Sequence, residues 1–77
     1  SAKAQAKIIN NLIEQNQLTE DELEIFKRAR NHKGTRHPKN TDIITYKHST
    51  GFEAIIGYLY LEDKERLNKI INTILEG

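Results

Sequence analysis

The stretch that decides the fold is Thr50–Leu61, TGFEAIIGYLYL, an apolar run that contains a single charged residue, Glu53. If this stretch is a helix, its residues lie about 100° apart around the axis. One side is then an apolar stripe of Phe52, Ile55, Ile56 and Leu59. The other side carries Ala54, Tyr58 and Leu61. A helix that is apolar all round belongs in a protein interior, so we predict that this helix is buried and that Glu53 lies at the edge of its stripe.

A carboxylate in apolar surroundings needs a partner, because desolvating it alone costs several kcal/mol. One candidate partner is the backbone, since Thr50-x-x-Glu53 has the pattern of a capping box in which Glu53 accepts from the Thr50 N–H. The other is a cation or a metal ion. Gly57, one turn further on, is expected to allow the close approach of a second helix or subunit.

Composition limits the chain to one small soluble domain. At 77 residues a single core is marginal, and with no cysteine neither a disulfide nor a thiolate zinc site supports it. Charged residues make up 30% of the chain and apolar residues 36%, a balance that suits a soluble globular protein and argues against disorder. The run Ala54–Leu61 is far too short to cross a bilayer, and no apolar segment of a signal peptide follows Lys3 and Lys7. We therefore expect a cytoplasmic protein.

Charge is strongly segregated along the chain. The segment Lys27–His48 holds seven basic residues and one acidic residue, a net charge of +6, whereas the rest of the chain carries −5. All three histidines also lie in this segment. A basic block in an otherwise acidic chain indicates a polyanionic partner on one face.

The first half of the chain predicts two helices. Apolar residues recur at helical spacing from Ala2 to Gln15. Thr19 then begins a second helix as its N-cap, with Glu22 closing a capping box. Leu18 and Leu23 are placed as a hydrophobic staple across this start.

The second half predicts a long loop and two more helices. From Asn31 to about Tyr46 the sequence contains Gly34, the only proline and no helical period, as expected of a loop. The third helix begins between Tyr46 and Thr50 and ends near Leu61. The fourth covers Lys64–Leu75, with five residues facing inward: Leu67, Ile70, Ile71, Ile74 and Leu75. The fold class is all-α, with about four helices, one long basic loop and a core that this chain closes only in part.

Three stretches carry a resemblance to a known family. They are SAKAQAKII (1–9), FKRARNHKGTRHPKNTDIITYKHST (26–50) and GFEAIIGYLYLEDKERLNKII (51–71). In order, spacing and loop length together, the chain resembles the ribonuclease III catalytic domain, in particular its short bacterial form called Mini-III. The resemblance covers essentially the whole chain.

The resemblance implies a homodimeric, all-helical endoribonuclease that cuts double-stranded RNA with Mg²⁺ and matures large-subunit ribosomal RNA. It makes Glu53, in the F-E-A-[IL]-[IL]-G motif, a metal ligand and catalytic residue. Larger members have an aspartate three residues before this glutamate. This chain has Thr50 there, as the Mini-III pattern would have it. The family's G-D-A helix, which supplies a catalytic aspartate, is not found in residues 1–77. We therefore expect these residues to be the C-terminal part of a single catalytic domain, inactive when tested alone.

The basic segment supplies the candidate RNA contacts. A-form RNA is recognised largely through phosphates and 2′-hydroxyls, which basic, amide and hydroxyl side chains can bind. The candidates are Arg28, Arg30, Lys33, Arg36, Lys39, Asn40 and Thr41. The alternative is that these charges form an ordinary solvated face.

The remaining polar and aromatic residues have plainer interpretations. His32-x₄-His37, with no cysteine nearby, is a weak zinc pattern. Tyr58 and Tyr60 are expected in the core or at a dimer interface. A second function class stays open, a non-catalytic helical module that binds RNA or another protein.

Overall fold

Four α-helices make up the fold. In a computed structural model, which describes residues 1–34 and 38–77, they are α1 (Ala2–Glu14), α2 (Glu20–Arg30), α3 (Ile43–Glu62) and α4 (Lys64–Glu76). No strand occurs in these two ranges. The prediction of an all-α domain with four helices and one long loop is confirmed.

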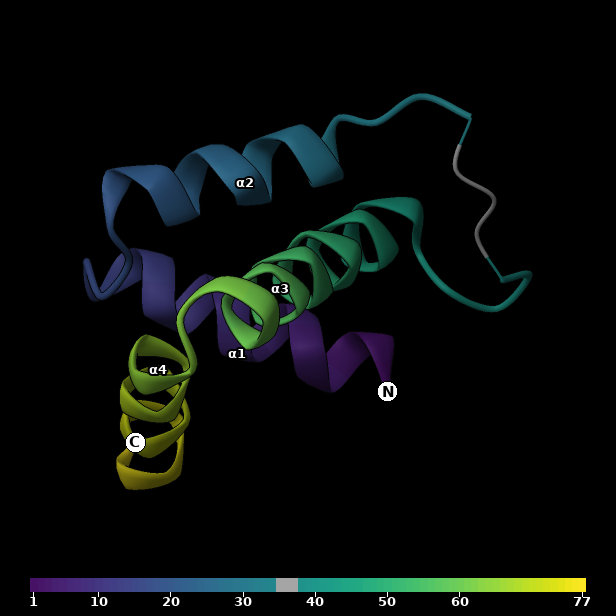
Figure 1. Cartoon of the computed structure of the whole chain (residues 1–77). Coiled ribbons are helices and arrows are strands. Elements are labelled where there is room, and N and C mark those ends of the chain that lie inside the picture. Colours follow the sequence, from purple (N-terminus) through teal and green to yellow (C-terminus); the bar gives the residue numbers. More distant parts are fainter. Residues whose placement is uncertain (35–37) are drawn as a thin grey trace.

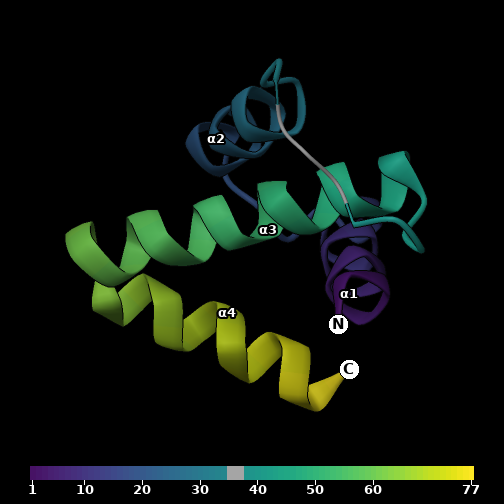
Figure 2. The same cartoon turned by 90° about the vertical axis from the view of Figure 1, so that its right-hand side faces the viewer.

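The third helix is the centre of the arrangement. Each extensively packed helix pair in the described part of the chain includes α3, which contacts α1, α2 and α4. Figure 1 shows α2 along one side of α3 and α1 behind it, and Figure 2 shows α4 turning back beneath α3 after a sharp corner. The weakest of the three pairings is the one with α4. One long helix therefore fixes where the other three lie.

The core is a single cluster to which every helix contributes. Its buried members are Ile9, Leu12, Leu18, Phe26, Ile55, Leu59, Leu67 and Ile70. The predicted stripe on α3 is confirmed, since Phe52 and Ile56 are partly buried and pack against this cluster. None of the helices in the described ranges is long and apolar enough to span a membrane.

The start of α2 matches its prediction and is tied to α4. Glu22 N–H donates to Thr19 Oγ1 over 3.1 Å, and Thr19 N–H donates to Glu22 Oε1 over 2.9 Å, which completes the capping box. The Glu22 carboxylate also accepts from Arg66 of α4, at 2.8 Å from Nε and 2.9 Å from Nη2. Arg66 Nη2 donates as well to the carbonyl of Gln17. This bidentate pair joins two helix starts to the turn between α1 and α2.

The third helix begins earlier than predicted. It starts at Ile43 because Asp42 caps it, with Asp42 Oδ2 accepting from the Thr45 N–H over 3.0 Å. The expected start between Tyr46 and Thr50 is wrong, since the backbone bonds already run from Tyr46 N–H to the Asp42 carbonyl. The loop is correspondingly shorter and ends at Asp42.

The glycine that allows close helix packing is Gly51, not Gly57. A Cβ on Gly51 would lie 2.4 Å from Phe26 Cδ1 and 3.1 Å from the Phe26 carbonyl oxygen. The backbones of α2 and α3 can therefore approach this closely only with glycine at that position. A Cβ on Gly57 would meet nothing within 4 Å, so no helix of the described residues approaches it closely, and the approach of a second subunit there stays a prediction.

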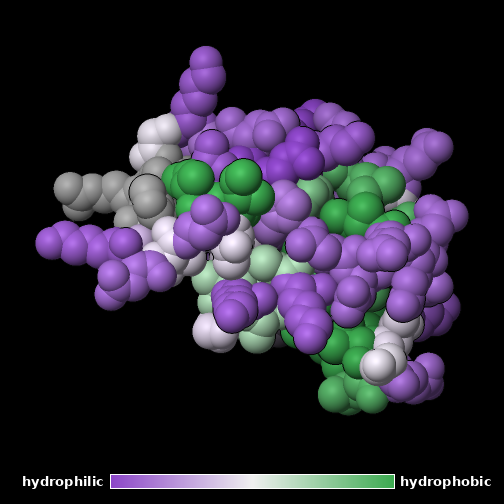
Figure 3. Space-filling view, turned by 180° about the vertical axis from the view of Figure 1, so that it is seen from behind, coloured by the Kyte–Doolittle hydropathy of each residue, from purple (hydrophilic) through white to green (hydrophobic). Residues whose placement is uncertain are grey.

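The inward face of α4 is narrower than predicted. Leu67 and Ile70 are buried and Ile74 packs against the core, as expected. The assignment of Ile71 and Leu75 to the core is wrong, since they are 39% and 79% exposed. After the corner, α4 diverges from α3 toward its C-terminal end (Figure 2), and Figure 3 shows apolar surface over this lower part of the molecule.

Replacing Gly51 with alanine is expected to destabilise the chain by about 2 kcal/mol, because α2 and α3 must separate or Phe26 must leave its rotamer. The matched control, for the isolated monomer of residues 1–77, is Gly57→Ala, which should be neutral or stabilising by up to about 1 kcal/mol because a Cβ there meets nothing within 4 Å. Urea unfolding followed by circular dichroism measures both. Equal effects of the two substitutions would contradict the close contact at Gly51.

The Glu22–Arg66 pair predicts a specific response to acid. Hydrogen bonds from Arg66 lower the pKa of Glu22 below 4.5, against the opposing effect of burial. A carboxylate with a lowered pKa stabilises the fold above its unfolded pKa, and this contribution is lost as the pH falls through the folded value. Glu22→Gln retains a capping acceptor but not the charge, so we expect the free energy of unfolding to fall by about 1–3 kcal/mol at neutral pH.

Urea unfolding at a series of pH values between about 6 and 3 tests this interpretation. The parent should lose more stability over this range than Glu22→Gln. The control is Glu20→Gln, at an exposed position in the same helical turn. Its loss of stability with falling pH should equal that of the parent. A Glu22→Gln curve parallel to the parent curve would show that the pair contributes nothing to acid sensitivity.

Candidate functional site

Glu53 lies on the open side of α3. The side chain is exposed, whereas Ile55 and Leu59 on the other side of the helix are buried. The prediction that Glu53 sits in a fully apolar interior is therefore wrong for this chain, because α1 and α2 cover only one side of α3. The capping alternative is also wrong, since Thr50 lies in the middle of α3 and not at its start.

Glu53 is one of several exposed acidic residues that have no structural partner in the described ranges, as are Glu20 and Glu62. Glu22 binds Arg66, Asp42 caps α3 and Asp63 caps α4. Glu53 makes no hydrogen bond or ion pair with any residue in the described ranges. A carboxylate that the fold does not use is free to bind a ligand from outside.

These residues alone do not make a metal site. Nowhere in residues 1–34 and 38–77 do three His, Cys, Asp or Glu side chains come together in a group that could hold a metal ion. Mg²⁺ prefers several oxygen ligands, so Glu53 fits the ion as one ligand and not as the whole site. The weak zinc pattern gains no support, because His37 lies outside the described residues.

The cations at the end of α2 differ in how firmly they are held. The Arg28 side chain is 81% exposed, with Nε 3.6 Å from Glu24 Oε1. Arg30 is half-buried, its Nε donates to Asn31 Oδ1 over 3.0 Å, and its Cζ lies 5.4 Å from the centre of the Phe26 ring. Both are in the last turn of α2, where positive charge is favoured by the helix dipole.

The predicted loop contacts lie at the surface. Lys33, Lys39 and Asn40 are exposed and Thr41 is half-buried, whereas Arg36 lies outside the described residues. Asn40 and Thr41 line a hollow of about 330 Å³ together with the start of α1, including Lys3. The structure thus adds Lys3 to this surface, a residue that its separation in sequence kept apart from the loop.

Lys47 continues the basic surface toward Glu53. It is six residues before Glu53 on α3, which corresponds to about 9 Å along the helix axis. The side chain is half-buried. Around the axis the two residues lie about 120° apart, so Lys47 and Glu53 do not point in the same direction.

His48 is a residue that sequence reasoning missed. Its Nδ1 is 2.8 Å from Asn10 Oδ1, and its ring meets Phe26 edge-on at 5.4 Å between centroids. Because an amide oxygen only accepts, Nδ1 carries the hydrogen. Burial, and secondarily the charge of Arg30, lower the pKa of His48 below 6.5. No local sequence signal indicates this arrangement, since its members come from three helices.

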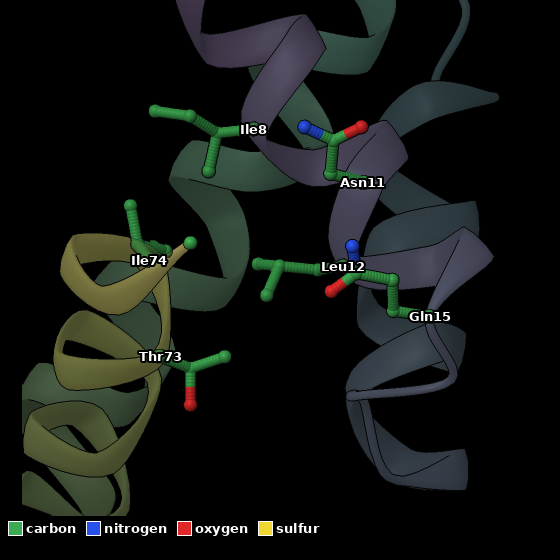
Figure 4. A pocket seen from close by; sticks show the side chains of 7 residues that line it. Ile8, Asn11, Leu12, Gln15, Thr73 and Ile74 are labelled. Atoms are coloured by element: carbon green, nitrogen blue, oxygen red, sulfur yellow. The ribbon is translucent and has the colours of Figure 1, made fainter.

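The other hollows do not suit RNA chemistry. One of about 80 Å³ lies between α1 and α4, where Ile8, Leu12 and Ile74 converge (Figure 4), and its lining contains no ionisable side chain. Another, of about 400 Å³, lies at the corner between α3 and α4 and is lined by Asp21, Glu62 and Asp63. An acidic hollow repels phosphate.

Tyr58 and Tyr60 lie on the open side of α3, 47% and 58% exposed. Of the two predicted positions, the core is therefore excluded among the described residues, and the dimer interface stays a prediction. Leu61 is 79% exposed beside them. Lys64 Nζ lies 5.0 Å from the centre of the Tyr60 ring.

The structure thus combines four helices, a basic loop and an exposed carboxylate on the helix that follows this loop. The chain belongs to the ribonuclease III domain family, whose sequence model matches residues 1–64. This confirms the resemblance noted from the three sequence stretches.

Its similarity to individual proteins is more specific. It is 47% identical to the Mini-ribonuclease 3 of Streptococcus pneumoniae over 77 residues, 99% of this chain and 60% of that protein. It is 47% identical to the Staphylococcus aureus Mini-ribonuclease 3, over 97% of this chain and 57% of that protein. With the Brevibacillus brevis Mini-ribonuclease 3 the identity is 49%, over 100% of this chain and 59% of that protein. The chain thus spans less than two thirds of these relatives.

Proposed function

We propose that the protein is an endoribonuclease, a hydrolase that cuts double-stranded RNA with Mg²⁺. In this proposal it matures large-subunit ribosomal RNA in the cytoplasm, and residues 1–77 are the C-terminal part of a single catalytic domain. Membership of the ribonuclease III domain family and the similarity to Mini-ribonuclease 3 proteins support the enzyme class. The observation that carries the assignment of a site is the exposed Glu53 carboxylate, which has no partner in the described residues and lies on the helix that follows the basic loop.

Glu53 serves as the catalytic metal ligand that this chain contributes. Its carboxylate has no competing partner in the described ranges, so binding Mg²⁺ breaks no interaction of the fold. When bound, Mg²⁺ would polarise the phosphate and activate water. Since the described residues form no group of three metal-ligating side chains, further ligands come from outside them, and residues 1–77 alone are expected to be inactive.

The RNA-binding surface joins the end of α2 to the start of α3. Arg28, Arg30 and Lys33 bind phosphates on one side of the loop, and Lys39, Asn40 and Thr41 bind on the other. Arg36 completes this set as proposed from sequence. The net charge of +6 in Lys27–His48 supplies the attraction, which is independent of base sequence.

A second copy of the protein covers the open side of α3 in a homodimer. Tyr58, Tyr60 and Leu61 expose apolar surface there, and Gly57 leaves room for close approach. Large exposed apolar patches on a small domain are typical of interaction sites. In this arrangement Glu53 lies at the rim of the covered surface.

A non-catalytic module that binds RNA or another protein is the second candidate. The specific observation in its favour is that no group of three metal-ligating side chains occurs in residues 1–34 and 38–77. Such a module needs the same basic surface but does not need Glu53. Cleavage therefore separates the two functions, whereas RNA binding does not.

Glu53→Gln in the full-length protein is expected to lower the rate of duplex RNA cleavage by at least about 100-fold, because an amide binds Mg²⁺ more weakly than a carboxylate. RNA affinity should stay within about two-fold, since the substitution leaves the basic surface unchanged. Cleavage of a duplex in Mg²⁺ and fluorescence anisotropy without Mg²⁺ measure the two effects. The control is Glu62→Gln, an exposed carboxylate at the other end of the same open helix. Full activity of Glu53→Gln would favour the non-catalytic module.

Lys33→Ala combined with Lys39→Ala should weaken duplex binding and lower the slope of log affinity against log salt by about 1–2, because each lysine that contacts a phosphate releases counterions. Anisotropy titrations between about 50 and 200 mM salt measure the slope. Lys69→Ala, an exposed lysine on α4 away from the loop, is the control (Figure 1). An unchanged slope in the double variant would remove the loop from the interface.

A further inference from the structure

Arg30 is the cation of the basic surface that the fold holds in a defined position. Its guanidinium lies over the Phe26 ring at 5.4 Å, and its Nε donates to Asn31 Oδ1 over 3.0 Å. The Nη groups make no hydrogen bond with residues in the described part of the chain. Arg28, by contrast, has an 81% exposed side chain and one loose ion pair at 3.6 Å.

The surface on which Arg30 lies is itself rigid. Phe26 is 2% exposed, and Gly51 of α3 lies so close that a Cβ there would be 2.4 Å from Phe26 Cδ1. His48 of α3 packs edge-on against the same ring at an interplanar angle of 82°. The hydrogen bond between His48 and Asn10 of α1 then fixes the imidazole. Three helices thus determine the orientation of one aromatic ring.

We propose that Arg30 is the fixed phosphate anchor of the RNA surface, and that Phe26, His48 and Asn10 are positioning residues that hold its guanidinium in place. The inference rests on the proposed function and specifies how it binds RNA. With the ring face and Nε already engaged, the two Nη groups present a planar fork to phosphate oxygens. Because this geometry exists before RNA arrives, binding costs less side-chain entropy than at an unrestrained lysine.

The arrangement couples RNA binding to His48. From α2 the charge of Arg30 acts on the imidazole, and from α1 its contact is the uncharged amide of Asn10. A phosphate bound to Arg30 offsets the positive charge that disfavours protonation of His48. The pKa of His48 should therefore rise when RNA binds. By linkage, RNA binding is then accompanied by proton uptake at His48 when the pH is near this pKa.

Substitutions at Arg30 test the anchor in the full-length protein carrying Glu53→Gln, which keeps a short RNA duplex intact. Arg30→Lys keeps the charge but cannot form the planar fork, so we expect affinity to fall about 10-fold, with little change in the salt slope. With Arg30→Ala the RNA affinity should fall further, and the slope of log affinity against log salt should decrease by about 1. The loss of RNA affinity in Arg28→Lys should be less than a third of the loss in Arg30→Lys. Thermal unfolding of each variant confirms that it is folded.

Titration of His48 by NMR, with and without the duplex, tests the coupling independently of affinity. The pKa of His48 should rise on RNA binding with arginine at position 30, and should be insensitive to RNA in Arg30→Ala. Two results would overturn this inference but not the proposed function. One is an equal RNA affinity of Arg30→Lys and its parent, and the other is a His48 pKa that does not change when the duplex binds. Failure of the parent to bind any duplex would overturn the proposed function as well.

Discussion

The contact between Phe26 and Gly51 is the constraint on which the rest of the structure depends. It brings the backbones of α2 and α3 together at a distance that no other residue at position 51 permits. The same contact places His48 against one edge of the Phe26 ring and Arg30 over its face. The core of this small domain and its candidate RNA surface thus share one aromatic side chain. A disturbance of packing there reaches the binding surface directly.

Three acidic residues of the chain cap helices and so build the fold, whereas Glu53 is among those that do not. Glu22, Asp42 and Asp63 satisfy backbone N–H groups at helix starts, where orphan donors need acceptors. Glu22 also accepts from Arg66, and these hydrogen bonds raise the pKa of the arginine. Glu53 is in the interior of α3, where backbone donors are already satisfied. The fold therefore leaves its carboxylate exposed, as it does those of Glu20 and Glu62, and the family motif rather than the missing partner distinguishes Glu53.

Features encoded within a few consecutive residues could be predicted from the sequence. The start of α2 is an example, because Leu18, Thr19 and Glu22 are within one turn of each other. The start of α3 was missed because the cap formed by Asp42 and Thr45 lies in a stretch whose proline and polar residues favour a loop. The Glu22–Arg66 pair joins residues 44 apart in sequence, so it depends on how the corner between α3 and α4 folds back.

The exposure of Glu53 could not be predicted for a different reason. Residue periodicity shows that both sides of α3 are apolar, but it does not show which neighbours the chain supplies to cover them. Two helices cover one side, and the other remains open with Tyr58, Tyr60 and Leu61. The apolar character of that side is therefore better explained by contacts beyond these residues than by an interior position within them.

The distribution of charge along α2 has a kinetic consequence. Its first turn carries Glu20, Asp21 and Glu22, and its last turn carries Lys27, Arg28 and Arg30. With the acidic hollow at the corner of α3 and α4, this makes one end of the molecule negative and the other positive. In the field of a highly charged rod such a molecule experiences a torque, which turns its loop end forward before any contact forms. Productive collisions become more frequent because the approach is already oriented.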